Sequence, residues 1–341
     1  MEKNKSLEIE ETLNLALKNH QDGKTNIAKE LYNQILKIDS KHLAALNNLG
    51  VIFVNSGEHQ KAKSYYKKII EINPNYADAH NNLGAIYKQL KENQKAKDCY
   101  EKAIEINPGY VDALYNLGVI YKESKENQKA KDCYEMLIKI DPGYLLAHNN
   151  LGNIFRELGE FQKAKDCYER AIKINPVYED AHNNLGNIFR ELGEYQKAKD
   201  CYEKAIEINP NYAVAYGNLG VIFEELGEIQ KVKDCYEKAI ELFPNYTHVH
   251  NLLLRYLYEV NNQSILFKRL DTIIKEGKMN AVIGSIFSRV QVKYGVKKEN
   301  PFCNNPLDYV LKTDLIQKYD FKNIIVECVQ NILKEDSISN K

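Results

Sequence analysis

Apolar residues recur along most of the chain at the spacing of paired helices. In residues 111–144, for example, Leu114 and Tyr121 belong to one stripe, because residues seven apart lie on the same side of a helix. The stripe stops at residues 124–127, and a second one follows over about 128–140, where an Asp-Pro pair ends the helical pattern. The stretch therefore predicts a hairpin of two helices.

The hairpin pattern repeats with a period of 34 residues. Residues 145–178 and 179–212 match at 28 of 34 positions, which indicates duplication of one structural unit. Six units are closed by a proline, at Pro74, Pro108, Pro142, Pro176, Pro210 and Pro244. Such periodicity is typical of a solenoid, in which each unit buries its second apolar face against the next unit.

Domain boundaries follow from this period. Six full units span 43–76, 77–110, 111–144, 145–178, 179–212 and 213–246. A weaker unit at 9–42 follows an N-terminal tail at 1–8, and a degenerate unit occupies 247–280. Residues 281–341 lack the period and predict a helical cap or docking segment, with helices over 281–294 and 321–333. Places in a unit are counted from its first residue, so that Val111 is at place 1.

A glycine at place 8 lies inside the first helix of each full unit. Glycine in a helix interior costs about 1 kcal/mol relative to alanine, so its recurrence calls for a compensating contact. We expect Gly118 to leave room for the small Ala130 of the partner helix, and Tyr134 to fill the space toward the next hairpin.

The repeated residues resemble those of the tetratricopeptide repeat. Leu-Gly at places 7 and 8, an aromatic residue at place 11, Ala at place 20, Tyr at place 24 and Pro at place 32 carry this resemblance. It implies an all-α protein, a right-handed superhelical α-solenoid of about seven helix hairpins, whose first helices line a concave groove. The Asn-Asn-Leu-Gly-Asn-Ile-Phe units are most similar to the repeat arm of O-linked N-acetylglucosamine transferases, although no matching glycosyltransferase domain follows.

Asparagines dominate the side of the first helix that faces away from its apolar stripe. Places 2, 5, 6, 9, 12 and 13 share that side, because an α-helix turns by about 100° per residue. The candidate peptide-binding amides at places 6 and 9 are Asn48, Asn82, Asn116, Asn150, Asn153, Asn184, Asn187 and Asn218. An amide both donates and accepts, so a ladder of amides can pair with the backbone of an extended peptide; in the transferase arm such a ladder is understood to hold substrate peptides. The alternative is that the place-6 asparagines bond to a neighbouring helix end.

Basic residues at place 12 adjoin acidic residues at place 13. The basic candidates are Lys88, Lys122, Arg156 and Arg190, and the acidic row includes Glu123, Glu157 and Glu191. Four aligned cations would favour an acidic peptide, although the neighbouring carboxylates weaken their field. Lateral ion pairs between adjacent helices are an equally good interpretation.

Cysteines and histidines also form rows, and we interpret both as packing residues. The thiols at place 23 are Cys99, Cys133, Cys167, Cys201 and Cys235, and the imidazoles at place 4 are His80, His148, His182 and His250. Cysteines 34 residues apart are expected about 10 Å from one another, too far for a disulfide or a shared metal. Because no nucleotide-binding loop or nucleophile motif is present either, the sequence predicts no catalytic residue, no metal site and no cofactor.

Composition restricts the partners and the compartment. Lys+Arg and Asp+Glu both number 47, so no net charge attracts nucleic acid or an acidic membrane. The N-terminus lacks the apolar core of a secretory signal, and no segment has the roughly 18 uninterrupted apolar residues of a membrane helix. We therefore expect a cytoplasmic protein with reduced thiols, no nucleic-acid partner and no membrane association.

These observations predict a non-catalytic scaffold that binds an extended peptide or protein segment in its concave groove. The alternative is a substrate-recruiting subunit, or a remnant, of a protein-modifying, glycosyltransferase-like enzyme whose catalytic domain lies on another chain. Whichever holds, the simplest role of the segment 281–341 is a cap on the last repeat, and the alternative is a docking element for a partner enzyme or a second copy of the chain.

Overall fold

The computed structural model describes residues 2–275 and 281–295, and every regular element in these ranges is an α-helix. Helices α1 to α11 are Glu2–Gln21, Thr25–Ile38, Leu43–Asn55, His59–Ile72, Ala77–Gln89, Asn93–Ile106, Val111–Glu123, Asn127–Ile140, Leu145–Glu157, Phe161–Ile174 and Glu179–Glu191. Helices α12 to α17 are Tyr195–Ile208, Ala213–Glu225, Ile229–Leu242, Thr247–Glu259, Gln263–Lys275 and Ala281–Tyr294. The predicted all-α fold of stacked helix hairpins is confirmed.

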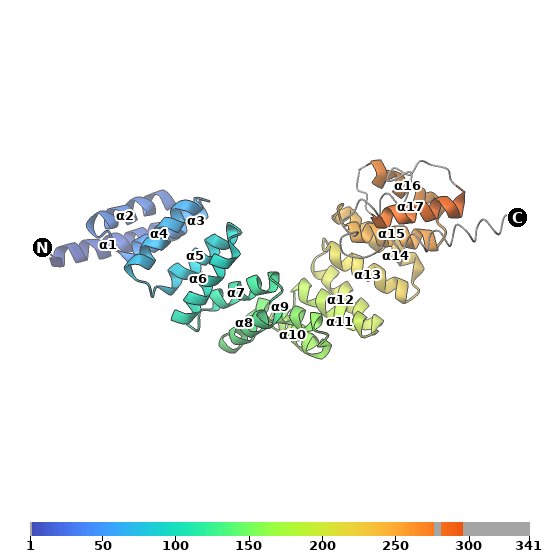
Figure 1. Cartoon of the computed structure of the whole chain (residues 1–341), viewed down its shortest axis with the longest axis horizontal. Helices are drawn as coiled ribbons and strands as arrows, with labels where there is room; N and C mark the ends of the chain where they lie inside the picture. Colours follow the sequence, from blue (N-terminus) through green and yellow to red (C-terminus); the bar gives the residue numbers. More distant parts are fainter. Residues whose placement is uncertain (1, 276–280, 296–341) are drawn as a thin grey trace, which may run out of the picture. The chain divides into compact units, whose positions relative to one another are not determined.

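The chain divides into two compact units, Met1–Ile188 and Phe189–Lys341, with the boundary inside α11. In the first unit, α1/α2, α3/α4, α5/α6, α7/α8 and α9/α10 form successive hairpins, and the second helix of each packs on the first helix of the next (Figure 1). In the second unit, α13/α14 and α15/α16 form hairpins in the same way. The predicted repeats that lie within one unit thus coincide with these hairpins.

The turn inside each hairpin depends on one residue with left-handed backbone geometry. Gly159 has φ +74°, a conformation that costs glycine nothing. Lys125 adopts nearly the same angle, φ 61°, although a side chain makes it less favourable. The hairpin geometry is therefore kept in units that lack the turn glycine.

In every full repeat the place-24 tyrosine is buried in the core, and this corrects the contact expected of the place-8 glycine. Tyr134 is 1% exposed, and a Cβ built on Gly118 would lie 2.7 Å from its ring carbon Cε1. The same close approach joins Gly152 to Tyr168, at 2.6 Å. The glycine is required because a tyrosine ring, and not the expected Ala130, lies against the first helix.

Aromatic residues at place 11 lie between lysines of two consecutive repeats. The ammonium groups of Lys97 and Lys129 both lie 5.1 Å from the ring centroid of Tyr121. Glu126 accepts hydrogen bonds from the same two lysines, each at 2.8 Å. These cation–π and ionic contacts join adjacent hairpins at the surface.

Both ends of the array extend the pattern. Helix α1 begins at Glu2, so residues 2–8 lengthen the first helix and do not form a separate tail. The degenerate unit folds as the hairpin α15/α16, and α17 packs on α15, where Lys293 donates to the carbonyl of Tyr258 at 2.9 Å. The predicted helix at 281–294 is thus α17, whereas the predicted helix at 321–333 lies outside the described residues.

Candidate peptide-binding face

The first helices of the first unit each carry polar residues on the side that was predicted to bind a peptide. We call it the first-helix face: the side of α3, α5, α7, α9 and residues 179–188 of α11 that bears places 2, 5, 6, 9, 12 and 13. Side-chain bonds join neighbouring helices along it: the Asn184 Nδ2 group donates to Asn149 Oδ1 at 3.0 Å, and Asn82 Nδ2 donates to Asn47 Oδ1 at 3.5 Å. Asparagine side chains thus bond to each other at two of the junctions between repeats, and their role as a peptide-binding ladder stays a prediction.

The place-6 asparagines of this face are half-buried. Asn150 donates to the hydroxyl of Tyr134 at 3.4 Å, and Asn48 donates to the carbonyl of Ala44, one turn earlier, at 2.8 Å. None of these bonds goes to the end of a neighbouring helix, which was the alternative expectation. Asn116 is also half-buried, and no hydrogen bond involves its side chain in the described structure.

The place-5 and place-9 asparagines lie deeper. Asn149 and Asn183 are 6% and 3% exposed, and Asn187 is 7% exposed. Asn153 is half-buried and accepts a hydrogen bond from the hydroxyl of Tyr168 at 2.8 Å. Places 5 and 9 thus contribute more to packing than helical spacing alone suggested, and place 6 forms the accessible row.

Two of the predicted basic residues form ion pairs with the next repeat. Lys88 Nζ lies 3.8 Å from the carboxylate of Glu123, and Lys122 pairs with Glu157. Arg156 is half-buried on the same face. The lateral pairing that we considered for this row is therefore present at Lys88 and Lys122, and a role of the row in binding stays a prediction.

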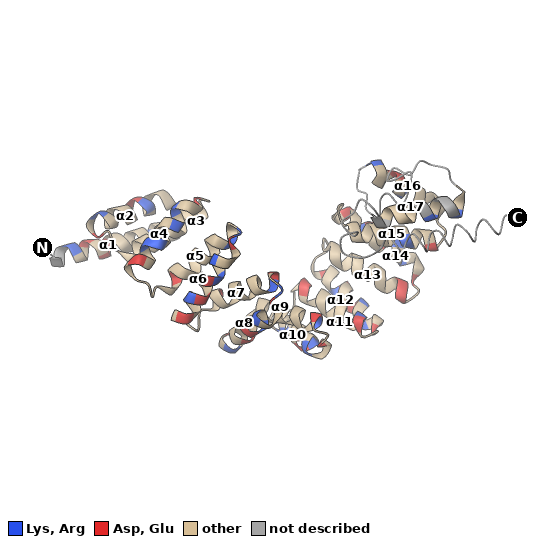
Figure 2. Ribbon diagram, viewed as in Figure 1, with Lys and Arg blue, Asp and Glu red and all other residues tan. Residues whose placement is uncertain are grey.

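Two predicted site residues, Arg190 and Asn218, belong to the second unit. Both are half-buried, on α11 and α13 respectively. In the repeat that follows Arg190, place 12 is acidic: Glu224 accepts a 2.7 Å bond from Arg255 on α15. Figure 2 shows that basic and acidic residues are intermixed along the helices of both units.

An acidic and aromatic row was missed by the sequence interpretation. The hydroxyl of Tyr110, at place 34, donates to Asp78 Oδ1 at 2.7 Å. Burial and this carboxylate raise the pKa of Tyr110 well above its usual value. Tyr115 packs against Tyr144 with ring centroids 5.5 Å apart. The recurrence of Asp at place 2 and Tyr at place 34 was the available signal.

The histidines at place 4 have a structural role, as expected, and they perform it through a hydrogen bond and not through packing alone. The Nε2 atom of His148 lies 3.0 Å from the carbonyl oxygen of Pro142, and His80 makes the same contact with Pro74 at 2.9 Å. In each case the imidazole satisfies the carbonyl of the proline that ended the preceding helix. In the described part of the chain, no group of three or more His, Cys, Asp or Glu residues could hold a metal ion.

The place-23 thiols are poor nucleophiles. Burial raises the pKa of Cys133 and Cys167 to about 12, and that of Cys99 to about 11. Carboxylates at the preceding place, such as Asp132, add to this effect. The thiolate is the reactive form, so this row is unsuited to covalent catalysis.

We predict slow alkylation of Cys133 in the folded protein at pH 8. A thiol with an ordinary pKa of about 8.5 is roughly one-quarter thiolate at that pH, whereas one with a pKa near 12 is about one ten-thousandth thiolate. Iodoacetamide labelling, followed at the Cys133 peptide by mass spectrometry, should be at least about 100-fold slower in the native protein than in urea. Equal rates in the two conditions would contradict the burial of this thiol.

Models of known protein families match most of the repeat array. A model described as tetratricopeptide repeat matches residues 44–76, 77–110, 146–178, 179–212 and 213–246, and a second model of that description matches 99–132. Together they cover more than half of the chain. The chain belongs to the tetratricopeptide repeat family. The narrower resemblance to the transferase arm gains no support from these matches.

Solved structures share the fold of this tetratricopeptide repeat protein. PilF of Pseudomonas aeruginosa is 20% identical, with a TM-score of 0.53 over 59% of this chain and 92% of that one. A chain of the APC/C hetero-tetramer Cut9-Hcn1 is 17% identical, with a TM-score of 0.56 over 77% and 52%. YrrB, described as a TPR protein with an unusual peptide-binding site, is 21% identical, with a TM-score of 0.49 over 54% and 95%.

Two further searches, one of curated proteins and one for membrane-spanning helices among the described residues, found no match. No curated protein matches the chain. Among the described helices, none combines the length and the apolar character needed to cross a membrane.

Proposed function

We propose that this tetratricopeptide repeat protein is a non-catalytic scaffold that binds an extended segment of another protein along the first-helix face. The observation that carries the proposal is the row of half-buried place-6 asparagines on five consecutive first helices. Three of these asparagines are bonded to the preceding repeat. The row comprises Asn48, Asn82, Asn116, Asn150 and Asn184.

These amides retain hydrogen-bonding capacity. A carboxamide has two N–H donors and an oxygen with two lone pairs. Asn150 and Asn184 each use one N–H in the bonds described above, which leaves their second N–H for a ligand. An extended peptide backbone offers matching C=O and N–H groups whatever its side chains are, so this row supports binding of many sequences.

The hydrogen bonds that these asparagines already make should also increase the affinity for a peptide. Ordering a flexible side chain at an interface costs about 0.5–1.5 kcal/mol. Because Asn184 is already held by Asn149, and Asn82 by Asn47, part of that cost is met before a ligand binds. A pre-positioned row is better suited to a backbone than isolated surface amides would be.

We predict that the triple variant Asn82→Ala, Asn150→Ala, Asn184→Ala loses about 100-fold in affinity for peptides selected on the unsubstituted chain. Each lost hydrogen bond contributes about 1 kcal/mol, and 1.4 kcal/mol corresponds to tenfold. The probes are unphosphorylated 12-residue peptides selected from a random displayed library, and fluorescence anisotropy measures their dissociation constants. Unchanged affinity in the triple variant would refute the ladder.

Two controls separate backbone recognition from other effects. The variant Asn75→Ala, Asn93→Ala removes exposed asparagines outside the face and should bind as the unsubstituted chain does. Scrambling a selected peptide should change its affinity only severalfold, whereas methylating alternate backbone nitrogens should weaken it about as much as the triple variant does, because it removes the donors that face the amide oxygens. Circular dichroism of each variant checks that it folds.

A further inference from the structure

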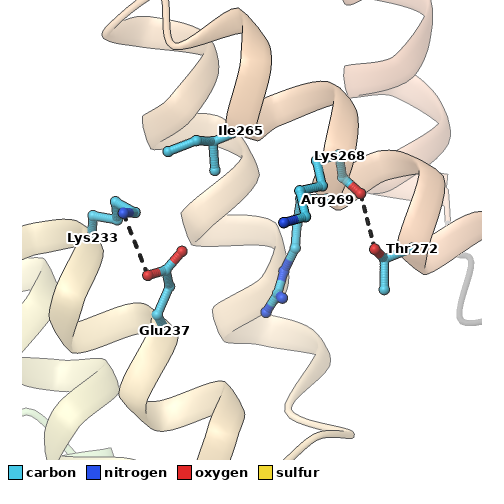
Figure 3. A pocket seen from close by; sticks show the side chains of 6 residues that line it. All are labelled: Lys233, Glu237, Ile265, Lys268, Arg269 and Thr272. Carbon is cyan, nitrogen blue, oxygen red and sulfur yellow. Dashed lines mark hydrogen bonds and ion pairs between the residues drawn. The ribbon is translucent and has the colours of Figure 1, made fainter.

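A cleft in the second unit lies between the second helices α14 and α16. Its volume is about 310 Å³, and its walls are Lys233 and Glu237 of α14 with Ile265, Lys268, Arg269 and Thr272 of α16. In Figure 3 the side chain of Arg269 extends from α16, with Lys233 and Glu237 on the opposite side of the cleft. Three cations and one carboxylate leave these walls with two net positive charges.

Among the described residues, none bonds to the guanidinium of Arg269. Its Nε atom is shielded from solvent and has no hydrogen-bond partner, and the side chain forms no ion pair with any described residue. Leaving a buried donor of a charged group unsatisfied is costly, so such a group points to a ligand that completes its bonds. The carboxylate of Glu237 does not serve Arg269; it lies 3.6 Å from Lys233 on its own helix.

The sequence pattern shows that these charges are particular to the degenerate unit. Arg269 stands at place 23, where five earlier units have cysteine, and Lys268 stands at place 22, where the same units have aspartate. The earlier rows are Cys99, Cys133, Cys167, Cys201 and Cys235, and Asp98, Asp132, Asp166, Asp200 and Asp234. At places 22 and 23 a carboxylate and a thiol are thus replaced by two cations, whereas the lysines that the earlier units have at places 19 and 21 are replaced by Ile265 and Phe267.

We propose that the cleft between α14 and α16 binds a phosphate group, held by Arg269 with Lys268 and Lys233. A guanidinium binds two oxygens of such an anion through its planar set of N–H groups, and the lysines supply point charges. The hydroxyl of Thr272 lies at the edge of the cleft and donates its one proton to the Lys268 carbonyl oxygen at 2.9 Å, so the cations carry the proposal. The cleft is separate from the first-helix face, which lies in the first unit.

The test measures binding of inorganic phosphate to the full chain by isothermal titration calorimetry, with chloride at the same ionic strength as the reference. Arg269→Cys and Lys268→Asp restore the residues of the earlier units, and each should weaken phosphate binding at least about tenfold. Lys204→Ala removes an exposed lysine of α12 outside the cleft and should leave binding unchanged. Phosphate binding that equals that of chloride, or that survives both substitutions, overturns the proposal.

A variant expected to gain affinity guards against misfolding as the explanation. Glu237→Gln removes the carboxylate of the cleft and releases Lys233, so phosphate should bind severalfold more tightly. Weaker or unchanged binding in this variant would count against the site.

A phosphoserine peptide and its unphosphorylated counterpart then distinguish the source of the phosphate. If the phosphoserine peptide binds more tightly than inorganic phosphate, the phosphate belongs to a modified protein. If it binds equally or more weakly, the ligand is a small free anion.

Discussion

Replacement of Tyr168 by alanine is expected to destabilise the first unit by about 3–5 kcal/mol, the range for removing a large aromatic side chain from a core. Tyr168 is fully buried, and its ring lies against Gly152 of the partner helix. Urea unfolding should show the loss as a lower midpoint, and amide hydrogen exchange should locate it in α9 and α10.

The phenylalanine variant divides this effect into two parts. Tyr168→Phe keeps the ring and removes the hydroxyl that donates to Asn153 at 2.8 Å. Its cost should be about 1 kcal/mol, the net contribution of a typical hydrogen bond. If Tyr168→Ala were no more destabilising than Tyr168→Phe, the ring would not be the core element that we describe.

Replacement of Gly152 by alanine is expected to destabilise the same hairpin by about 1–3 kcal/mol. This result is opposite in sign to helix propensity, which favours alanine over glycine by about 1 kcal/mol. The added Cβ would lie 2.6 Å from the Cε1 atom of Tyr168, and the ring has no free space into which to move. Urea unfolding provides the measurement, with Gly109→Ala as the control, because a Cβ there meets only Asn107 Oδ1 at 3.4 Å.

The double variant tests the cause. In the Tyr168→Ala background the ring is absent, so Gly152→Ala should become neutral or stabilising by up to about 1 kcal/mol through helix propensity. A penalty that persisted in the double variant would show that some neighbour other than Tyr168 excludes the methyl group.

Much of the fold could be predicted because the repeat supplies many copies of the same information. The Asn-Pro and Asp-Pro pairs mark where each second helix ends, and apolar spacing places the first helix of the third full unit at Val111–Glu123, as found. The helix at Ala281–Tyr294 was also located from spacing alone. Periodicity identifies which side of a helix is apolar, and that is enough to predict hairpins and their stacking.

The side-chain contacts were less predictable. Spacing shows that Gly118 faces its partner helix, but the choice between Ala130 and Tyr134 depends on how far a ring reaches along the interface. Place 5 falls on the polar side of the helix, yet Asn149 is buried because the next first helix covers it with Asn184. Contacts between repeats depend on the angle at which hairpins stack, which a single unit's sequence does not encode.

The bond between Asn184 and Asn149 joins residues 35 positions apart, one more than the length of a repeat. Its donor comes from place 6 of one unit and its acceptor from place 5 of the preceding unit, so any junction between two such units contains both groups. A gene that gained or lost a whole repeat by unequal crossing-over would keep an intact junction on each side. If the proposed function holds, the length of the bound segment would change in steps of one repeat, without the origin of any new contact.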